Sequence, residues 1–356
     1  MNLRFLHTAD WQLGASQHNN IHKIGMLPKL AKMAKDKEVD FILVVGDIYD
    51  KPHPDQRIKD MLLETILANE DLLWVFTIGN HDYIDKTHTY HSLRNLQLHE
   101  KKVKNIYILE EKTKTHVTIY NEEVLDVNFI VLPENFSTEW VENDKNDYTI
   151  VCCHGLLPGL NIKDPKQNEA AHKKSFEILL KTKGTYLALG DIHKHFAISE
   201  VCAYPGALVQ KTYACEEGMY LIDLVDDAVS VESLHLDLPK KVNIHLEFDN
   251  ENISEEATIA FVRDEVEKGN MVRLLFNLPM ETWKGLNKEY IKNELLKDYL
   301  EIKLDNDPVQ EKRTRQSMGK MIKAKNVEEE LDIVIQENNF NLDEGKLKKT
   351  CRRYLK

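Results

Sequence analysis

Five segments of this chain place metal-ligand residue types directly after a short apolar run. The runs span residues 3–7, 41–45, 73–78, 149–153 and 186–189, and each is typical of a buried strand. The polar segments that follow contain Asp10 and Gln12, Asp47, Asn80 to Asp82, His154, and Asp191 and His193. Because helical stretches separate the runs, we expect a largely parallel α/β sheet, whose strands end along one edge. The sequence therefore predicts that these side chains meet at one edge of one sheet.

The residue types at this edge favour a metal site. Carboxylate, amide and imidazole groups are ligands for divalent cations, and the carboxylate of Asp47 can give one oxygen to each of two ions. Two ions roughly 3.5 to 4 Å apart clamp a phosphate during in-line displacement. Each segment alone is also typical of a turn or helix cap, but five in succession are hard to explain as unrelated caps. We interpret them as a site for phosphoester hydrolysis.

Seven short motifs follow one another in a recognisable order. They are Thr8–Gly14, Gly46–Asp50, Gly79–Asp82, His154–Gly155, Gly190–Lys194, Tyr204–Ala207 and Gly218–Ile222. In this order they resemble the SbcD family within the calcineurin-like metallophosphoesterases. The resemblance covers about residues 1 to 225, and beyond them only the general layout matches. It implies an α/β metallophosphoesterase sandwich that acts on DNA as an exonuclease or endonuclease in double-strand-break repair.

The same resemblance implies roles for individual residues. It assigns Asp10, Gln12, Asp47 and His193 to a first ion, and Asp47, Asn80, His154 and Asp191 to a second. His81 corresponds to the family residue that faces the scissile phosphate and helps the leaving oxygen to depart. We expect the neighbouring Asp82 to hold the imidazole of His81, which makes these two the catalytic pair.

Two positions depart from the family pattern. Gln12 stands where the family usually has a histidine, and Asp191 stands where it has the first histidine of a Gly-His-x-His motif. A neutral amide oxygen binds late transition metals more weakly than imidazole does, whereas a carboxylate adds charge that suits Mn²⁺ or Mg²⁺. We therefore expect two Mn²⁺ ions as the cofactor, with Mg²⁺ as the other candidate.

A second register of the last motif uses different histidines. His193 and His195 also stand two positions apart, and this register pairs them as the final ligands. Gly190 before Asp191, together with the Tyr204-Pro205-Gly206 landmark downstream, favours Asp191 and His193 instead. His195 is then expected near the site rather than in it.

Other readings keep the fold but change the function. The two departures also fit a non-catalytic or attenuated scaffold for a partner ATPase, although both replacement side chains can still bind a cation. A phosphodiesterase that acts on small molecules is the other alternative, and the chain beyond the motifs argues against it. Metal-dependent turnover separates the enzyme from the scaffold.

The chain divides into three parts in our interpretation. Residues 1–238 form the metallophosphoesterase domain, residues 239–308 a small α+β capping domain, and residues 309–356 a basic linker with a helical tail. The middle part has a β-α-β-α-β order, with strands at 242–248, 271–276 and 300–304 and helices at 255–268 and 288–299. In the family such a domain caps the active-site edge.

The tail combines a basic run with two apolar stripes. Lysines and arginines between residues 312 and 325 form a run without acidic residues, typical of either a solvated linker or a contact to phosphates. Apolar residues recur on one helical face over 327–334 and again over 347–355. These stripes either pack back on the cap or, as the resemblance implies, dock on the coiled coil of an SbcC-type ABC ATPase. A homodimer is a family expectation only.

Composition limits the compartment and the partners. The net charge of −12 means that any DNA contact is local rather than spread over the surface. No apolar stretch approaches the roughly 18 to 20 residues of a membrane span, and no signal-peptide pattern precedes the first strand. The five cysteines form no CxxC pair, which favours reduced thiols and a cytoplasmic protein. Without a Walker phosphate loop, ATP hydrolysis is left to a partner.

Overall fold

The fold is that of a computed structural model of the protein. The structure describes all residues except 1, 15–16, 86, 101–103, 121–123, 140, 142–147, 163–167, 211, 214–215, 227, 247–253 and 308–356. The predicted linker and docking tail, residues 309–356, thus lie outside the described residues.

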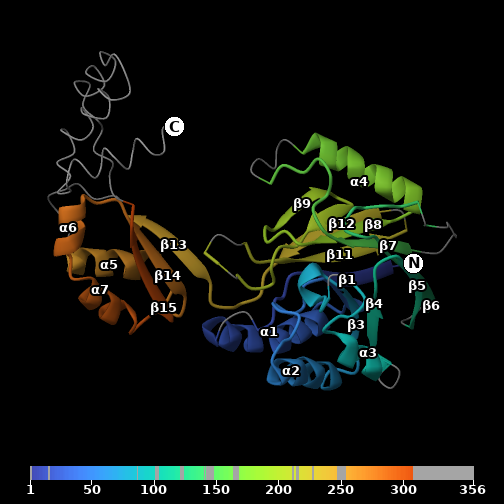
Figure 1. The fold of residues 1–356 in the computed structure, drawn as a ribbon, viewed down its shortest axis with the longest axis horizontal. Helices are drawn as coiled ribbons and strands as arrows, with labels where there is room; N and C mark the ends of the chain where they lie inside the picture. The colour runs from blue at the N-terminus through green and yellow to red at the C-terminus, as the bar shows by residue number, and fades with distance from the viewer. Residues whose placement is uncertain are drawn as a thin grey trace, which may run out of the picture.

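The first sheet contains six strands, among them the first strand of the chain (Figure 1). In spatial order they are β12 (Ala228–Leu234), β11 (Met219–Val225), β1 (Asn2–Thr8), β2 (Phe41–Val45), β3 (Leu73–Thr77) and β4 (Ile106–Leu109). β1 to β4 are parallel, while β11 and β12 pair antiparallel at one side. The carboxyl ends of β1, β2 and β3 therefore lie side by side, which brings the first three motifs together.

The second sheet also has six strands. Their order is β5 (Thr113–Tyr120), β6 (Val124–Val131), β7 (Tyr148–His154), β8 (Tyr186–Gly190), β10 (Cys202–Tyr204) and β9 (Phe196–Ser199). β7 and β8 are parallel neighbours, with His154 paired opposite Gly190. The last two ligand motifs consequently belong to this sheet, so the expectation of a single sheet edge is wrong. The ligands come from the edges of two sheets.

The two sheets pack face to face between helical layers. Alternate residues of β2 decide this arrangement, because Phe41, Leu43 and Val45 face the core between the sheets, whereas Ile42 and Val44 face the helices. The first sheet is covered by α1 (Gln17–Asp36), α2 (Gln56–Leu67) and α3 (Arg94–Glu100), and the second by α4 (Glu169–Thr182) (Figure 1). This four-layer α/β sandwich agrees with the predicted fold class.

Aromatic rings and one buried histidine join the sheets. Phe5 and Phe41 of the first sheet stack with ring centroids 4.7 Å apart, and the ring of Phe41 meets Phe129 of the second at 5.5 Å. The imidazole of His7 lies 3.0 Å from the Tyr186 hydroxyl and 3.1 Å from the Leu189 carbonyl oxygen. Burial lowers the pKa of His7 to about 3, so this ring is neutral and structural.

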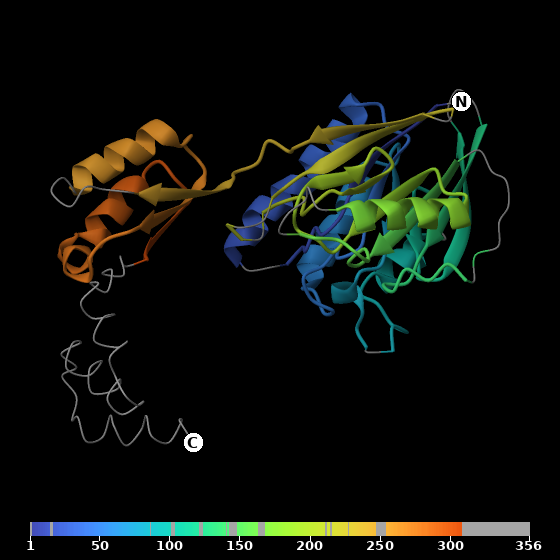
Figure 2. The same ribbon diagram turned by 90° about the horizontal axis from the view of Figure 1, so that it is seen from above.

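A third, smaller sheet follows. It contains β13 (Lys241–Leu246), β14 (Met271–Phe276) and β15 (Glu301–Asn306), all parallel, with α5 (Glu255–Glu265), α6 (Met280–Gly285) and α7 (Lys288–Leu295) between them. The predicted β-α-β-α-β order is present, with α6 as an addition. In Figure 2 this unit lies apart from the two larger sheets. Tyr213 contacts it, because its carbonyl accepts from Asn243 and its hydroxyl donates to Glu301.

The structure also bears on the cysteines and on membrane-spanning segments. Cys152, Cys153 and Cys202 are buried free thiols, as predicted for reduced cysteines. Among the described residues, no helix is both long and apolar enough to cross a membrane.

The core between the sheets yields a stability prediction. Phe129→Ala removes a fully buried ring that contacts Phe41, so the free energy of unfolding should fall by about 3 to 5 kcal/mol. The same change at Phe176, which is 43% exposed on α4, should cost about 0.5 kcal/mol or less. Urea unfolding of both variants measures the difference, and equal losses would contradict the sandwich packing.

Candidate metal centre

Three ligand side chains converge where the two sheets meet. Asp10 follows β1, Asp47 follows β2, and His154 ends β7. One potential ligand atom from each lies within 4.8 Å of the other two, and all three side chains are buried. His154 Nε2 lies 3.3 Å from Asp47 Oδ1. These residues form the centre of the site.

Backbone hydrogen bonds hold the three loops in register. Asp10 N donates to Gly46 O at 3.1 Å, and Gln12 N donates to Asp47 O at 2.8 Å, which ties the first loop to the second. Asp191 N donates to Asp10 Oδ2 at 3.1 Å, which brings in the loop after β8. The carboxylates are therefore positioned by fixed backbone rather than by mobile side chains.

His154 is oriented as a ligand. Its Nδ1 lies 2.9 Å from the carbonyl oxygen of Val45, which can only accept, so Nδ1 carries the proton and donates. Nε2 then points at the carboxylates, and a metal-binding histidine usually has this arrangement. Nε2 and Asp10 Oδ1 are buried without a hydrogen-bond partner among the described residues. These two atoms lie 3.9 Å apart, and buried ligand atoms left in this way fit a site that binds cations.

Burial and charge shift the titration of these groups strongly. Burial raises the pKa of Asp10 to about 7, and the neighbouring Asp47 adds to the effect. Burial alone would lower the pKa of His154, but Asp47 and Asp10 raise it to about 10. For Asp47, burial opposes ionisation, yet His154 holds its pKa below the usual value. The positive charge of His154 stabilises the neighbouring carboxylates in their ionised form. A bound dication would stabilise them in the same way.

The remaining predicted ligands differ in how close they lie to this centre and in how they are oriented. His193 Nε2 lies 3.7 Å from Asp10 Oδ1, and Asp191 Oδ1 lies 3.9 Å from His154 Nε2. The amide nitrogen of Gln12 lies 3.1 Å from His193 Nε2, so binding through its oxygen requires the amide to flip. Asn80 is exposed at the start of the short 3-10 helix η1 (Asn80–Asp82), directly before His81.

His195 lies outside this group. Its Nδ1 is 2.8 Å from the Pro205 carbonyl oxygen, its Nε2 is 2.6 Å from the Ser233 hydroxyl, and its ring stacks on Tyr220 at 4.3 Å. These contacts orient both ring nitrogens away from Asp10, whereas His193 faces it. The geometry thus favours the register with Asp191 and His193.

The predicted catalytic pair is arranged differently from the expectation. His81 Nε2 lies 3.9 Å from Asp47 Oδ2, but its Nδ1 contacts the backbone carbonyl of Asp50 at 3.0 Å. The carboxylate of Asp82 instead accepts the backbone N–H groups of Ile48, Tyr49 and Gly79. Asp82 therefore braces the loops that carry Asp47 and His81, and the Asp50 carbonyl holds the imidazole. Sequence reasoning missed the carbonyls of Val45 and Asp50 because no side-chain pattern marks them.

Four site residues have left-handed backbone conformations. Asp10, Gln12, Asp47 and Asp191 have φ angles of 53°, 44°, 53° and 91°. Such conformations cost of order 1 kcal/mol or more for residues other than glycine, and they cluster at functional sites where neighbours enforce them. The strain at four predicted ligands is evidence for a site that is independent of their chemistry.

A comparison with known proteins agrees with this geometry. A family model described as calcineurin-like phosphoesterase matches residues 3–195. The chain belongs to this family. Its members are phosphoester hydrolases with a dinuclear metal site, and the buried group of Asp10, Asp47 and His154 agrees with that.

Individual relatives are more distant. A stretch of 90 residues is 31% identical to the SbcD component of the nuclease SbcCD from Bacillus subtilis (strain 168), covering 24% of this chain and 23% of that protein. The match thus spans about a quarter of that relative. TT1561 of Thermus thermophilus aligns with a TM-score of 0.42 at 12% identity, over 65% of this chain and 99% of its own. Purple acid phosphatase PPD1 from yellow lupin aligns with a TM-score of 0.38 at 11% identity, over 65% and 51%.

A glycine beside Asp47 tests the geometry of the centre. A Cβ at Gly79 would collide with the carboxylate and backbone nitrogen of Asp47. Gly79→Ala should therefore displace this ligand and weaken Mn²⁺ binding by about 10- to 100-fold, the usual effect of disturbing a ligand's support. Gly25→Ala, where a Cβ meets open space, is the matched control. Calorimetric titration of both variants provides the comparison, and unchanged affinity in Gly79→Ala would remove Asp47 from the metal shell.

Proposed function

We propose that this chain is a metal-dependent phosphodiesterase that cleaves DNA, as the nuclease subunit of an SbcC/SbcD-like repair complex. The observation that carries the proposal is the convergence of Asp10, Asp47 and His154, whose ligand atoms all lie within 4.8 Å of one another in a buried site. Membership of the family supports phosphoester hydrolysis as the reaction. The 31% sequence identity with a bacterial nuclease subunit over 90 residues supports DNA as the substrate.

Two ions fit the donor set that the chain offers. We infer that Asp10, Gln12, Asp47 and His193 hold one ion, and that Asp47, Asn80, His154 and Asp191 hold the other. Three carboxylates against two imidazoles favour Mn²⁺, with Mg²⁺ as the weaker activator. When bound, the ions polarise the phosphate oxygens and lower the pKa of a coordinated water.

The chain's own contribution to cleavage falls to His81. Its imidazole is 40% exposed, so a substrate can reach it, and the Asp50 carbonyl fixes its orientation. Nδ1–H donates to that carbonyl, so Nε2 is the ring atom that can give a proton to the leaving oxygen. Asp82 acts through the loops that it braces and is a positioning residue in this proposal.

Asp47→Ala and His81→Ala should separate metal binding from proton transfer. Asp47→Ala should abolish both Mn²⁺ binding and hydrolysis of bis-p-nitrophenyl phosphate, because this carboxylate would be a ligand of both ions. His81→Ala should lower turnover by roughly 100- to 10,000-fold while metal content stays close to that of the wild type. His172→Ala on α4 is the control, since its exposed ring lies on a different layer.

Metal analysis and kinetics on the same preparations decide between the outcomes. If the His81 variant also lost its metals, the proton-transfer role would be wrong. If the wild type bound Mn²⁺ but cleaved neither diester nor DNA, a scaffold for a partner would replace the enzyme in this account.

Gln12→His tests the residue that stands where the family usually has a histidine. We expect this glutamine to weaken the binding of one ion. We expect wild-type Mn²⁺ binding in two steps of unequal affinity, because the amide of Gln12 must flip before its oxygen can bind the first ion. The imidazole of Gln12→His should tighten the weaker step and leave the stronger one unchanged. Isothermal titration calorimetry measures both steps, and identical isotherms would exclude Gln12 from the ligands.

The partner proposal concerns the parts of the chain around the sandwich. We propose that residues 1–238 form the nuclease domain, residues 239–308 a cap, and residues 309–356 the docking element for a coiled-coil ABC ATPase. A homodimer of the nuclease domains is part of the same proposal. The distant likeness to an SbcCD component supports this assignment.

Deleting residues 309–356 should remove partner binding without removing catalysis. The truncated chain retains every predicted ligand and all three described sheets, so it should still cleave bis-p-nitrophenyl phosphate. A pull-down with a purified SbcC-type ATPase, using full-length chain as the control, measures docking. Full-strength capture of the ATPase by the truncated chain would contradict the proposal.

A further inference from the structure

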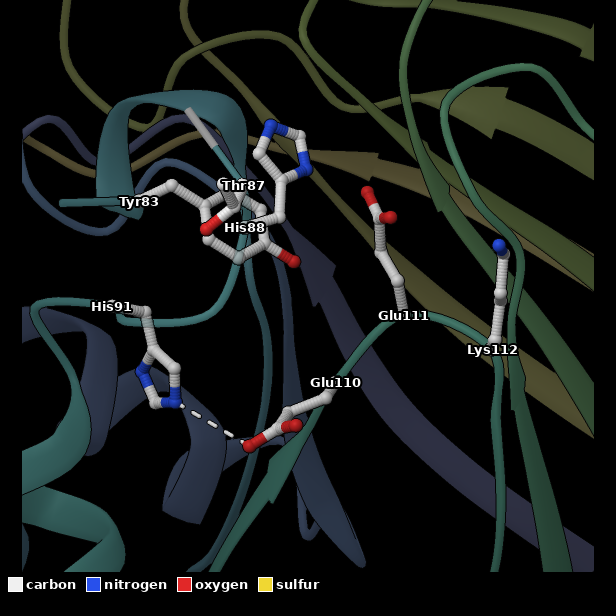
Figure 3. A pocket seen from close by; sticks show the side chains of 7 residues that line it. All are labelled: Tyr83, Thr87, His88, His91, Glu110, Glu111 and Lys112. Atoms are coloured by element: carbon white, nitrogen blue, oxygen red, sulfur yellow. Dashed lines mark ion pairs between the residues drawn. The ribbon is translucent and has the colours of Figure 1, made fainter. Parts of the chain in front are cut away.

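A pocket of about 450 Å³ opens at the same edge of the sandwich (Figure 3). Its lining comes from the segment after η1 (Tyr83, His88 and His91) and the segment after β4 (Glu110, Glu111 and Lys112). β3 and β4 are parallel neighbours, so both segments begin at the carboxyl edge that carries Asp47 and His81. Tyr83 also stands two residues after His81 in the chain. The pocket thus adjoins the metal centre.

One wall of this pocket is a preformed aromatic surface. The ring of His88 stacks on Tyr83 with centroids 4.0 Å apart and planes inclined by 9°. His88 has a φ of 56°, a conformation that the surrounding turn must enforce. The carboxylate of Asp85 organises this turn, because it accepts from the Thr87 hydroxyl and the backbone N–H groups of Thr89 and Tyr90. The imidazole is therefore held in place before a ligand arrives.

The opposite wall carries two acids, Glu110 and Glu111, and one base, Lys112. In Figure 3 the side chains of Glu111 and Lys112 extend in the same direction, and Glu111 lies between Lys112 and the ring of His88. Lys112 has a φ of 55°, and its N–H donates to Val131 O, so this segment is also fixed. Glu110 is already engaged by His91 Nε2 at 3.5 Å. Two carboxylates against one lysine make the pocket unsuited to a phosphate and suited to a ligand with N–H donors.

We propose that this pocket binds the nucleobase next to the scissile phosphate and prefers a base with an exocyclic amine. Because it names a subsite of the proposed DNA phosphodiesterase, the inference rests on that function. The base stacks on the open face of His88. Glu111 accepts from the exocyclic amine, and Lys112 donates to the neighbouring ring acceptor, which matches the donor-acceptor edge of cytosine. Thymine presents carbonyl oxygens on both sides of its one ring N–H, and these repel the carboxylate.

Binding of dCMP and dTMP to the full chain in Mn²⁺ tests the subsite. These two nucleotides have the same ring size and phosphate, so their difference reports the base edge. Deoxyribose 5-phosphate, which has no base, reports the phosphate anchor alone. Isothermal titration calorimetry should give tighter binding for dCMP than for dTMP, and both should exceed deoxyribose 5-phosphate.

Two substitutions separate stacking from edge recognition. His88→Ala should weaken both nucleotides about tenfold, since base stacking is worth roughly 1 to 3 kcal/mol, and should leave deoxyribose 5-phosphate unchanged. Glu111→Gln should weaken dCMP severalfold and leave dTMP within twofold. His172→Ala, which removes a ring that lies 4.9 Å from Phe176 on α4, is the matched control and should change nothing. Circular dichroism checks that each variant folds.

The outcomes distinguish this subsite from the metal centre. Equal binding of dCMP, dTMP and deoxyribose 5-phosphate would overturn the subsite while leaving the phosphodiesterase intact. Nucleotide binding that depends on His88, without any binding of deoxyribose 5-phosphate, would support the subsite and count against the metal anchor. Absence of binding by all three probes would overturn both.

Discussion

The hydrogen bond from His154 to Val45 is the constraint on which the site depends. Val45 ends β2 in the first sheet and His154 ends β7 in the second, so this 2.9 Å contact joins the two sheets at their functional edge. It also decides which imidazole nitrogen faces Asp47. A shift of either sheet would therefore move a ligand, and the aromatic contacts between Phe41 and Phe129 resist such a shift. The geometry of the centre therefore depends on how the two sheets of the sandwich pack.

The sequence predicted the strands that carry ligands better than the strands between them. β2 occupies residues 41–45 as expected, because an apolar run bounded by polar residues identifies a buried strand. β5 and β6 were not predicted, since no metal-ligand motif follows either strand. Without them, the division into two sheets could not be inferred, because hydrophobic periodicity does not encode which strands pair. Tyr83, His88 and His91 follow the third motif closely enough for the sequence to suggest a substrate groove there, but nothing in it marked Glu110, Glu111 and Lys112 as the opposite wall of the pocket.

The candidate residues themselves were readable from the sequence, but their supports were not. Asp10 and Asp47 meet as their positions after parallel strands of one sheet imply, and His154 joins them from the second sheet. The left-handed backbone of Asp10 and Asp47 and the carbonyl of Asp50 beneath His81 are products of tertiary structure. Asp82 illustrates the difference, because its place beside His81 in the chain implied a contact that its three backbone N–H partners preclude. Motif chemistry identifies ligands, whereas burial and backbone geometry determine how they are held.

We propose that the centre would hold two ions, with Asp47 as a ligand of both. Crystals of the full chain grown with MnCl₂, measured at the manganese absorption edge, test this most directly. We predict two anomalous peaks roughly 3.5 to 4 Å apart, one on each side of the Asp47 carboxylate. A single peak, or two peaks that do not share Asp47, would contradict the account.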